Sequence, residues 1–69
     1  MEEILTKREI SILKEVIKGK TNKTIAKELF LSQSTVKAHI SSIIRKFEAT
    51  NRVEIAVKGA LFLYNAKII

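Results

Sequence analysis

Apolar residues in the first part of the chain recur at intervals of three and four positions, which is the period of one face of a helix. The pattern predicts a helix over residues 7–18. Thr6 and Glu9 have the T-x-x-E spacing of a capping box at its start, and Gly19 offers a left-handed backbone conformation at its end. The predicted inward face consists of Ile10, Ile12, Leu13, Val16 and Ile17.

Three further helices follow from the same period and from polar residues suited to helix starts. The capping residues are Thr21, Ser32 and Asn51, of which Asn51 repeats the capping box with Glu54. The helices cover residues 22–30, the stretch from Ser32 to Phe47, and residues 52–64. Their apolar arcs are Ile25, Ala26, Leu29 and Phe30 in the second helix, and Val36, Ile40, Ile43, Ile44 and Phe47 in the third. Strand-like alternation is absent, so we predict one all-α domain of four helices over residues 1–69.

The fourth predicted helix has apolar residues on two opposite faces, although a core of three helices covers one of them. One face carries Val53, Ala56, Val57, Ala60, Leu61 and Tyr64. The other carries Ile55, Gly59, Phe62, Leu63 and Ala66. Glycine within a helix costs roughly 1 kcal/mol relative to alanine, which favours the close approach of another backbone at Gly59. We predict that this second face forms a homodimer; the alternatives are that residues 65–69 fold back over it or that a neighbouring domain covers it.

The composition excludes several classes of protein. The 69 residues contain no cysteine and one histidine, so neither a disulfide framework, a zinc–thiolate site nor a catalytic triad can be assembled. We therefore expect no enzyme activity, no metal and no cofactor. No apolar run approaches the roughly 20 residues of a membrane span. Because Met1 is followed by Glu2 and Glu3 where a signal peptide carries basic residues, we expect a cytoplasmic protein with no membrane partner.

Positive charge is concentrated in the second and third predicted helices. The formal net charge is +6, and between residues 20 and 47 six basic residues accompany a single acidic one, Glu28. The basic residues are Lys20, Lys23, Lys27, Lys37, Arg45 and Lys46. The outward face of the third helix carries Ser34, Lys37, Ala38, Ser41 and Arg45. Short side chains between cations allow close contact with base edges, while the cations contact phosphates. The alternative is that this side of the third helix is an ordinary solvated face.

The second and third predicted helices are joined by a very short connection at Leu31 and Ser32, which is the geometry of a helix-turn-helix. With the charge distribution, this geometry predicts that the chain binds double-stranded DNA. The alternative is a helical adaptor that binds another protein through the second apolar face of the fourth helix. An adaptor would lack the steep salt dependence that phosphate contacts give to DNA affinity.

An ordered series of short motifs resembles the LuxR-type helix-turn-helix family, above all the output domains of NarL/FixJ-type response regulators and the stand-alone GerE-like regulators. The motifs are LTKRE at 5–9, GKTNKTIA at 19–26, LS at 31–32, TVKAHI at 35–40, KF at 46–47 and NRVE at 51–54. The resemblance implies a dimeric bacterial transcription regulator whose third helix enters the major groove and whose fourth helix forms the dimer. It also implies RNA polymerase as a further partner.

The resemblance assigns roles to individual residues. It places Lys37, Ala38 and Ser41 against the bases. It places the DNA backbone beside Asn22, Lys23, Ser32, Ser34, Thr35, Arg45 and Lys46, and Lys20 joins this set by its charge. Two positions depart from the family pattern. Thr24 stands where the family prefers glutamate, and Glu48 must make a turn for which the family uses glycine.

Overall fold

The computed structural model describes residues 5–68 and contains four helices in that range. They are α1 (Lys7–Ile17), α2 (Asn22–Leu29), α3 (Gln33–Lys46) and α4 (Arg52–Asn65). The predicted all-α fold is confirmed, and each predicted helix bound lies within one residue of the observed one. No helix among the described residues is long and apolar enough to cross a membrane. The expectation drawn from Met1, Glu2 and Glu3 lies outside the described residues.

All four predicted capping residues accept a hydrogen bond from the backbone three positions ahead. Thr6 and Glu9 form the complete capping box. The box at α4 is half-formed, because the Glu54 carboxylate accepts from Thr50 rather than from Asn51. At α2, the hydroxyl of Thr24 accepts from Thr21 at 3.1 Å, in the place of the carboxylate that the family prefers.

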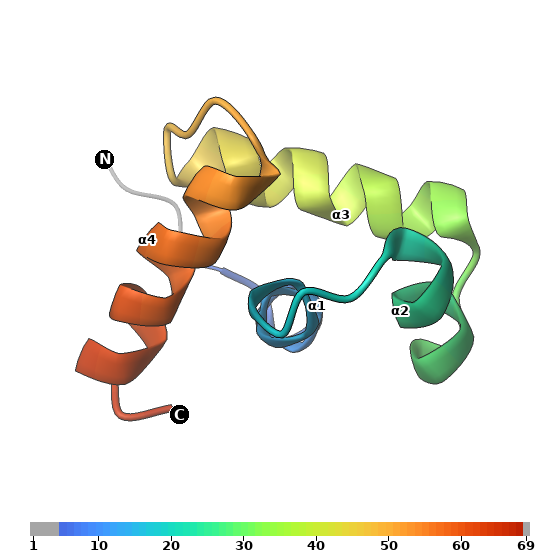
Figure 1. Ribbon diagram of the computed structural model, residues 1–69, viewed down its shortest axis with the longest axis horizontal. Coiled ribbons are helices and arrows are strands. Elements are labelled where there is room, and N and C mark those ends of the chain that lie inside the picture. The colour runs from blue at the N-terminus through green and yellow to red at the C-terminus, as the bar shows by residue number, and fades with distance from the viewer. Residues whose placement is uncertain (1–4, 69) are drawn as a thin grey trace.

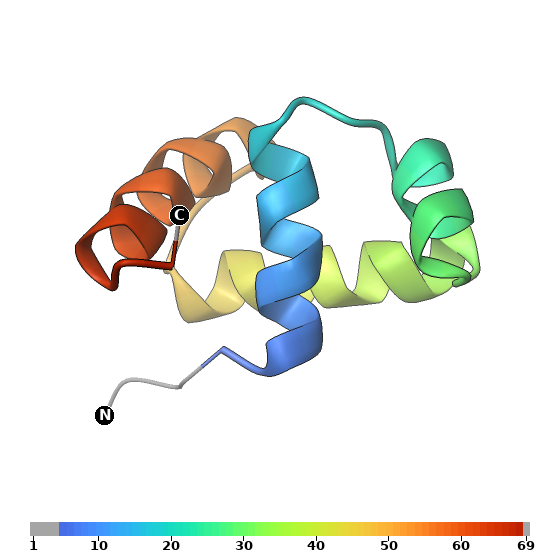
Figure 2. The same ribbon diagram turned by 90° about the horizontal axis from the view of Figure 1, so that it is seen from below.

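The helices are arranged around α1, which crosses the middle of α3 and lies between α2 and α4 (Figures 1 and 2). α2 packs at one end of α3 and α4 packs against the other end. Between them lies one apolar core of Leu5, Ile12, Leu13, Val16, Ile25, Ala26, Val36, Ile40, Ile43, Ile55 and Leu63. This packing leaves the side of α3 that faces away from α1 uncovered by any helix (Figure 1).

The two apolar faces of α4 have the opposite roles to those predicted. Ile55, Gly59 and Leu63 are buried in the core of the single chain, so the predicted dimer face is wrong for these three residues. The group that approaches Gly59 closely is the side chain of Leu13 in α1 and not the predicted second backbone, because a methyl group at Gly59 would lie 2.6 Å from Leu13 Cδ1. Phe62 packs edge-on against Phe47 with ring centroids 5.7 Å apart.

Most of the other α4 face, predicted to be inward, points into solvent, although Ala56 packs against the core. Val53, Val57, Leu61 and Tyr64 are 59–72% exposed and follow one another at intervals of four, four and three residues. We call these four residues the α4 stripe. Ala66, the fifth residue of the predicted dimer face, is exposed but lies at the end of the helix, on the side opposite to the stripe. The described tail residues 66–68 are themselves exposed and leave the α4 stripe open.

Each helix is followed, within two residues of its end, by a residue with a left-handed backbone. These residues are Gly19, Phe30, Glu48 and Lys67, with φ of 83°, 58°, 53° and 60°. At α3 the amide of Glu48 bonds to the carbonyl of Arg45 and the amide of Ala49 to that of Ile44, which is the Schellman pattern. The expectation that Glu48 makes a glycine-type turn is confirmed.

Replacing Glu48 with glycine should stabilise the chain by about 1 kcal/mol, because a left-handed backbone costs an L-residue roughly 1–2 kcal/mol that glycine avoids. Urea denaturation followed by circular dichroism measures the change. The matched control is Gly19→Ala, where the added methyl group would meet no atom within 4 Å, so that its expected loss of about 1 kcal/mol is purely a backbone effect. A less stable Glu48→Gly variant would contradict this account of the turn.

Candidate nucleic-acid interface

The uncovered side of α3 carries the face that the sequence predicted. Ser34, Lys37, Ala38, Ser41 and Arg45 are all exposed. Val36, Ile40 and Ile43 are buried on the opposite side of the same helix, which fixes the rotation of α3 about its axis. We call the five exposed residues the α3 ridge. Its short side chains allow another molecule to come close to the helix backbone between the cations.

The start of α3 adds a cluster of hydroxyl groups beside the ridge. Ser32 Oγ accepts from the amide of Thr35 at 3.0 Å and donates to Thr35 Oγ1 at 2.8 Å. Ser34 Oγ lies 3.1 Å from the same Ser32 oxygen. Hydroxyls and free amides at a helix start suit an anionic group such as a phosphate.

Lysine side chains flank this cluster on α2. Lys23 and Lys27 are exposed, as is Lys37 on the ridge, and none of the three pairs with an acidic residue of the described chain. Lys23 is the second residue of α2, near the helix end whose amides favour negative charge. These three cations therefore remain available to an acidic ligand.

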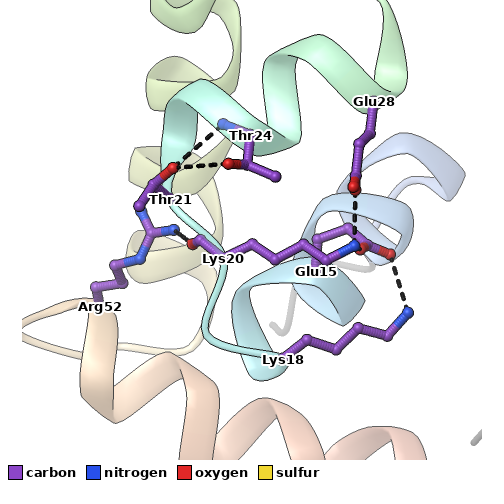
Figure 3. A network of polar contacts seen from close by, with 7 residues as sticks. All are labelled: Glu15, Lys18, Lys20, Thr21, Thr24, Glu28 and Arg52. Atoms are coloured by element: carbon purple, nitrogen blue, oxygen red, sulfur yellow. Dashed lines mark hydrogen bonds and ion pairs between the residues drawn. The ribbon is translucent and has the colours of Figure 1, made fainter.

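Lys20 does not contribute a free charge, contrary to prediction. Its ammonium lies 2.6 Å from a Glu15 oxygen and 2.7 Å from a Glu28 oxygen, so it links α1 to α2 (Figure 3). The hydrogen bond from Lys20 lowers the pKa of Glu15, and the bonds to Glu15 and Glu28 raise the pKa of Lys20. We therefore assign Lys20 to the fold and remove it from the candidate interface.

Asn22 is also engaged within the chain. Its side-chain oxygen accepts from the guanidinium of Arg52. The same guanidinium also donates to the backbone carbonyl of Lys20 (Figure 3). Arg52 thus ties the start of α4 to the turn between α1 and α2. Arg52 belongs to the NRVE motif at 51–54, but the spacing of apolar residues gave no indication that its side chain binds Asn22 and the carbonyl of Lys20.

Lys46 belongs to a buried polar cluster rather than to the surface, and its predicted contact with the DNA backbone is removed from the interface. Its side chain is 11% exposed, and its ammonium lies 2.7 Å from Glu9 Oε1. The Thr6 amide donates to the same Oε1 at 2.9 Å, and Ser42 Oγ donates to Glu9 Oε2 at 2.7 Å. Burial alone raises the pKa of Glu9, but the bonds from Lys46, Thr6 and Ser42 outweigh it and lower the pKa to about 2. We call Glu9, Ser42 and Lys46 the α1–α3 polar cluster.

The remaining arrangement suits recognition of a polyanion. The described residues contain no group of three potential metal ligands among His, Cys, Asp and Glu. What stays exposed is a row of cations and hydroxyls on α2 and α3, formed by Lys23, Lys27, Ser32, Ser34, Lys37, Ser41 and Arg45. Half-buried Thr35 stands at its edge.

The chain is similar to known bacterial regulators over most of its length. The sequence model of the family described as "Bacterial regulatory proteins, luxR family" matches residues 3–58. The chain is 41% identical over 64 residues to the uncharacterized transcriptional regulatory protein YhcZ of Bacillus subtilis, which covers 93% of the chain and 30% of that protein.

Two further relatives have similar coverage. The chain is 49% identical over 55 residues to the transcriptional regulatory protein LiaR of Bacillus subtilis, covering 80% of the chain and 26% of the relative. It is 44% identical over 50 residues to the nitrate/nitrite response regulator protein NarP of Escherichia coli K12. This match covers 72% of the chain and 23% of the relative. The chain therefore spans less than a third of the length of these relatives.

Proposed function

This chain belongs to the luxR family of bacterial regulatory proteins, and we propose that it binds double-stranded DNA as the recognition part of a transcription regulator. The observation that carries the proposal is the α3 ridge, which projects from the uncovered side of α3 with its apolar side anchored in the core. A helix presented in this way fits the major groove of B-DNA, which is about 12 Å wide.

Two groups of residues have different tasks in this proposal. Lys37, Ala38 and Ser41 lie along the ridge and meet base edges, where a lysine can donate to guanine and a methyl group can contact thymine. The DNA backbone passes Lys23, the hydroxyls of Ser32, Ser34 and Thr35, and Arg45. Because these groups reach phosphates rather than bases, they set affinity and register but not sequence preference.

We further propose that two chains pair through the α4 stripe when bound to DNA. An apolar row on one helix is self-complementary under two-fold symmetry, because each residue can meet the matching part of the same row in a second copy. α4 lies at the end of α3 opposite to α2, so pairing there leaves both α3 ridges open (Figure 1). Two ridges would then read half-sites about one helical turn apart.

Substitution of Lys37 tests the proposed reading of bases. With DNA selected from a random pool, Lys37→Ala should weaken binding by about 1–3 kcal/mol and relax the base preference at one position. The control is Lys23→Ala, which should weaken all sequences alike and reduce the slope of log affinity against log salt by about one. Fluorescence anisotropy at several salt concentrations measures both effects.

Two results of that titration would contradict the proposal. Equal loss of base preference in both variants would mean that the ridge does not read sequence. Absence of any salt-dependent affinity for duplex DNA in the unmodified chain would favour the adaptor, whose binding surface is then the α4 stripe.

A further inference from the structure

The side chain of Arg52 leaves its own helix and holds the start of another. Arg52 is the first residue of α4, and its guanidinium donates to the side-chain oxygen of Asn22 and to the carbonyl of Lys20; Figure 3 shows the second bond. These partners lie 30 and 32 residues away in the sequence, at the start of α2 and in the turn that leads to it. Within residues 5–68, no other hydrogen bond joins α4 to α2.

The start of α2 needs such a contact because the helix is short and has few apolar anchors. α2 has eight residues, of which Ile25 and Ala26 are buried. The sequence placed Phe30 in the apolar arc of this helix, but Phe30 follows the last helical residue with a left-handed backbone and is 95% exposed. The prediction for Phe30 is therefore wrong. Polar contacts such as the bond between Asn22 and Arg52 fix the start of the helix instead.

The bond to Arg52 also determines which way the Asn22 carboxamide faces. A guanidinium has donors and no acceptor, so it can bind the oxygen of a carboxamide but not its nitrogen. Nδ2 of Asn22 is therefore directed away from Arg52, and it donates to no atom within residues 5–68. A bond from a cation to the oxygen polarises the carboxamide, which strengthens Nδ2 as a donor. Asn22 thus has one end engaged within the chain and the other end available to a ligand.

The available nitrogen lies where the proposed function places a phosphate. Asn22 precedes Lys23 at the end of α2 that is nearer to the uncovered side of α3 (Figure 1). Ionised phosphate oxygens accept hydrogen bonds, so they bind Nδ2 and repel a carboxamide oxygen. A carboxamide turned the other way would direct its oxygen at the same phosphate. The orientation that Arg52 imposes is therefore the one that favours DNA.

We propose that Arg52 is a positioning residue for DNA binding, which directs Nδ2 of Asn22 at a phosphate without touching the DNA itself. This inference rests on the proposed function and deepens it, because the resemblance that assigns Asn22 to the DNA backbone gives no role to Arg52. Asn22 carries no charge, so its bond to a phosphate adds affinity without changing the salt dependence. It reaches no base, so it adds nothing to sequence preference.

Replacing Arg52 with lysine tests this role, because lysine keeps the charge but lacks the planar fork that binds two acceptors at fixed angles. With DNA selected from a random pool, Arg52→Lys should bind about tenfold more weakly, with the salt slope and base preference of the parent chain. The matched control is Arg8→Lys, which should keep the parent affinity, because Arg8 is exposed on α1 and has no partner within residues 5–68. Circular dichroism checks that both variants are folded at the temperature of the titration.

The same substitution in an Asn22→Ala background shows whether Arg52 acts through Asn22. Asn22→Ala alone should weaken binding about tenfold. Adding Arg52→Lys should then change the affinity by less than about twofold, because the group that Arg52 positions is gone. Two independent losses that add would overturn the proposal, since Arg52 would then contact the DNA directly or act only on the stability of the fold.

The parent chain provides a readout that does not depend on the folding of a variant. In a proton–nitrogen correlation NMR spectrum, a side-chain Nδ2 proton of Asn22 should move downfield when selected duplex DNA is added, because it then bonds to a phosphate oxygen. An unchanged signal in the bound chain would overturn the positioning role while leaving DNA binding intact. If the parent chain fails to bind the selected DNA in the first titration, it is the proposed function that fails.

Discussion

Replacing Glu9 with glutamine should lower the free energy of unfolding by about 3 kcal/mol at neutral pH, a large part of what a chain of this size can have. Glu9 is 3% exposed, and its carboxylate accepts hydrogen bonds from Thr6, Ser42 and Lys46. Glutamine keeps the shape but leaves the 11%-exposed ammonium of Lys46 without its carboxylate. Removing one partner of a buried ion pair is costly because the other charge stays buried. Urea denaturation at pH 7 measures the loss.

The double variant Glu9→Gln, Lys46→Met provides the control for this cause. Removing both charges should recover part of the stability, since a buried pair replaced by neutral groups of similar size is often nearly neutral. The parent chain, Glu9→Gln, Lys46→Met and the double variant form a double-mutant cycle. The coupling energy from this cycle measures the interaction between the two charged groups. Full additivity would mean that Glu9 stabilises the chain through its hydrogen bonds with Thr6 and Ser42 and not through Lys46.

The pH dependence of unfolding provides a second readout of the same carboxylate. The pKa of Glu9 is lowered from 4.5 to about 2, so its ionised form stabilises the fold above pH 4.5 and this contribution is lost as the pH falls toward 2. A shift of this size corresponds to about 3 kcal/mol. The gap between the parent chain and Glu9→Gln should shrink by more than half by about pH 3. The pKa values of Glu15 and Glu54 are also lowered, but both carboxylates are present in both proteins, so the comparison isolates Glu9.

Local signals in the sequence were sufficient to predict the helices. Capping residues and apolar spacing act over three or four positions, so Thr6, Thr21, Ser32 and Asn51 could each be assigned without knowledge of the tertiary structure. The exposure of the α3 ridge followed in the same way, because α3 has a single apolar face. Family membership followed from the spacing of motifs that run through all four helices.

Pairings between helices could not be predicted from such signals. Periodicity divides α4 correctly into two faces, but both are apolar, and which one meets α1 depends on the fit of Gly59 against Leu13. The same limit applies to the cations. Lys20 and Lys46 look like the other lysines in the sequence, yet carboxylates on neighbouring helices pair with both of them. A count of basic residues in the sequence therefore gives more lysines for phosphate contacts than the folded chain leaves unpaired, because it includes Lys20 and Lys46.

Because the α4 stripe is the exposed apolar row of α4, a substitution within it should abolish the pairing of two chains. Leu61→Asp should leave the monomer folded, because Leu61 is 60% exposed and surface substitutions usually change stability by less than about 0.5 kcal/mol. In a two-fold dimer the new carboxylate would face its own copy across an apolar contact, so pairing should be lost. Affinity for DNA with two half-sites should then fall about 100-fold, while affinity for a single half-site is retained. The reason is that joining two DNA-binding units raises their affinity for paired half-sites by at least about 100-fold.

Leu63→Asp is the discriminating control, since it lies two residues further along the same helix on the predicted but incorrect dimer face. Leu63 is fully buried beneath α4, so a carboxylate there should unfold the chain rather than leave a soluble monomer. Analytical ultracentrifugation with DNA present, together with circular dichroism, separates loss of pairing from loss of fold. If Leu61→Asp bound two-half-site DNA as tightly as the parent chain, the α4 stripe would have to be covered by some other partner, because four exposed apolar residues in one row would otherwise remain in water at the moment of DNA binding.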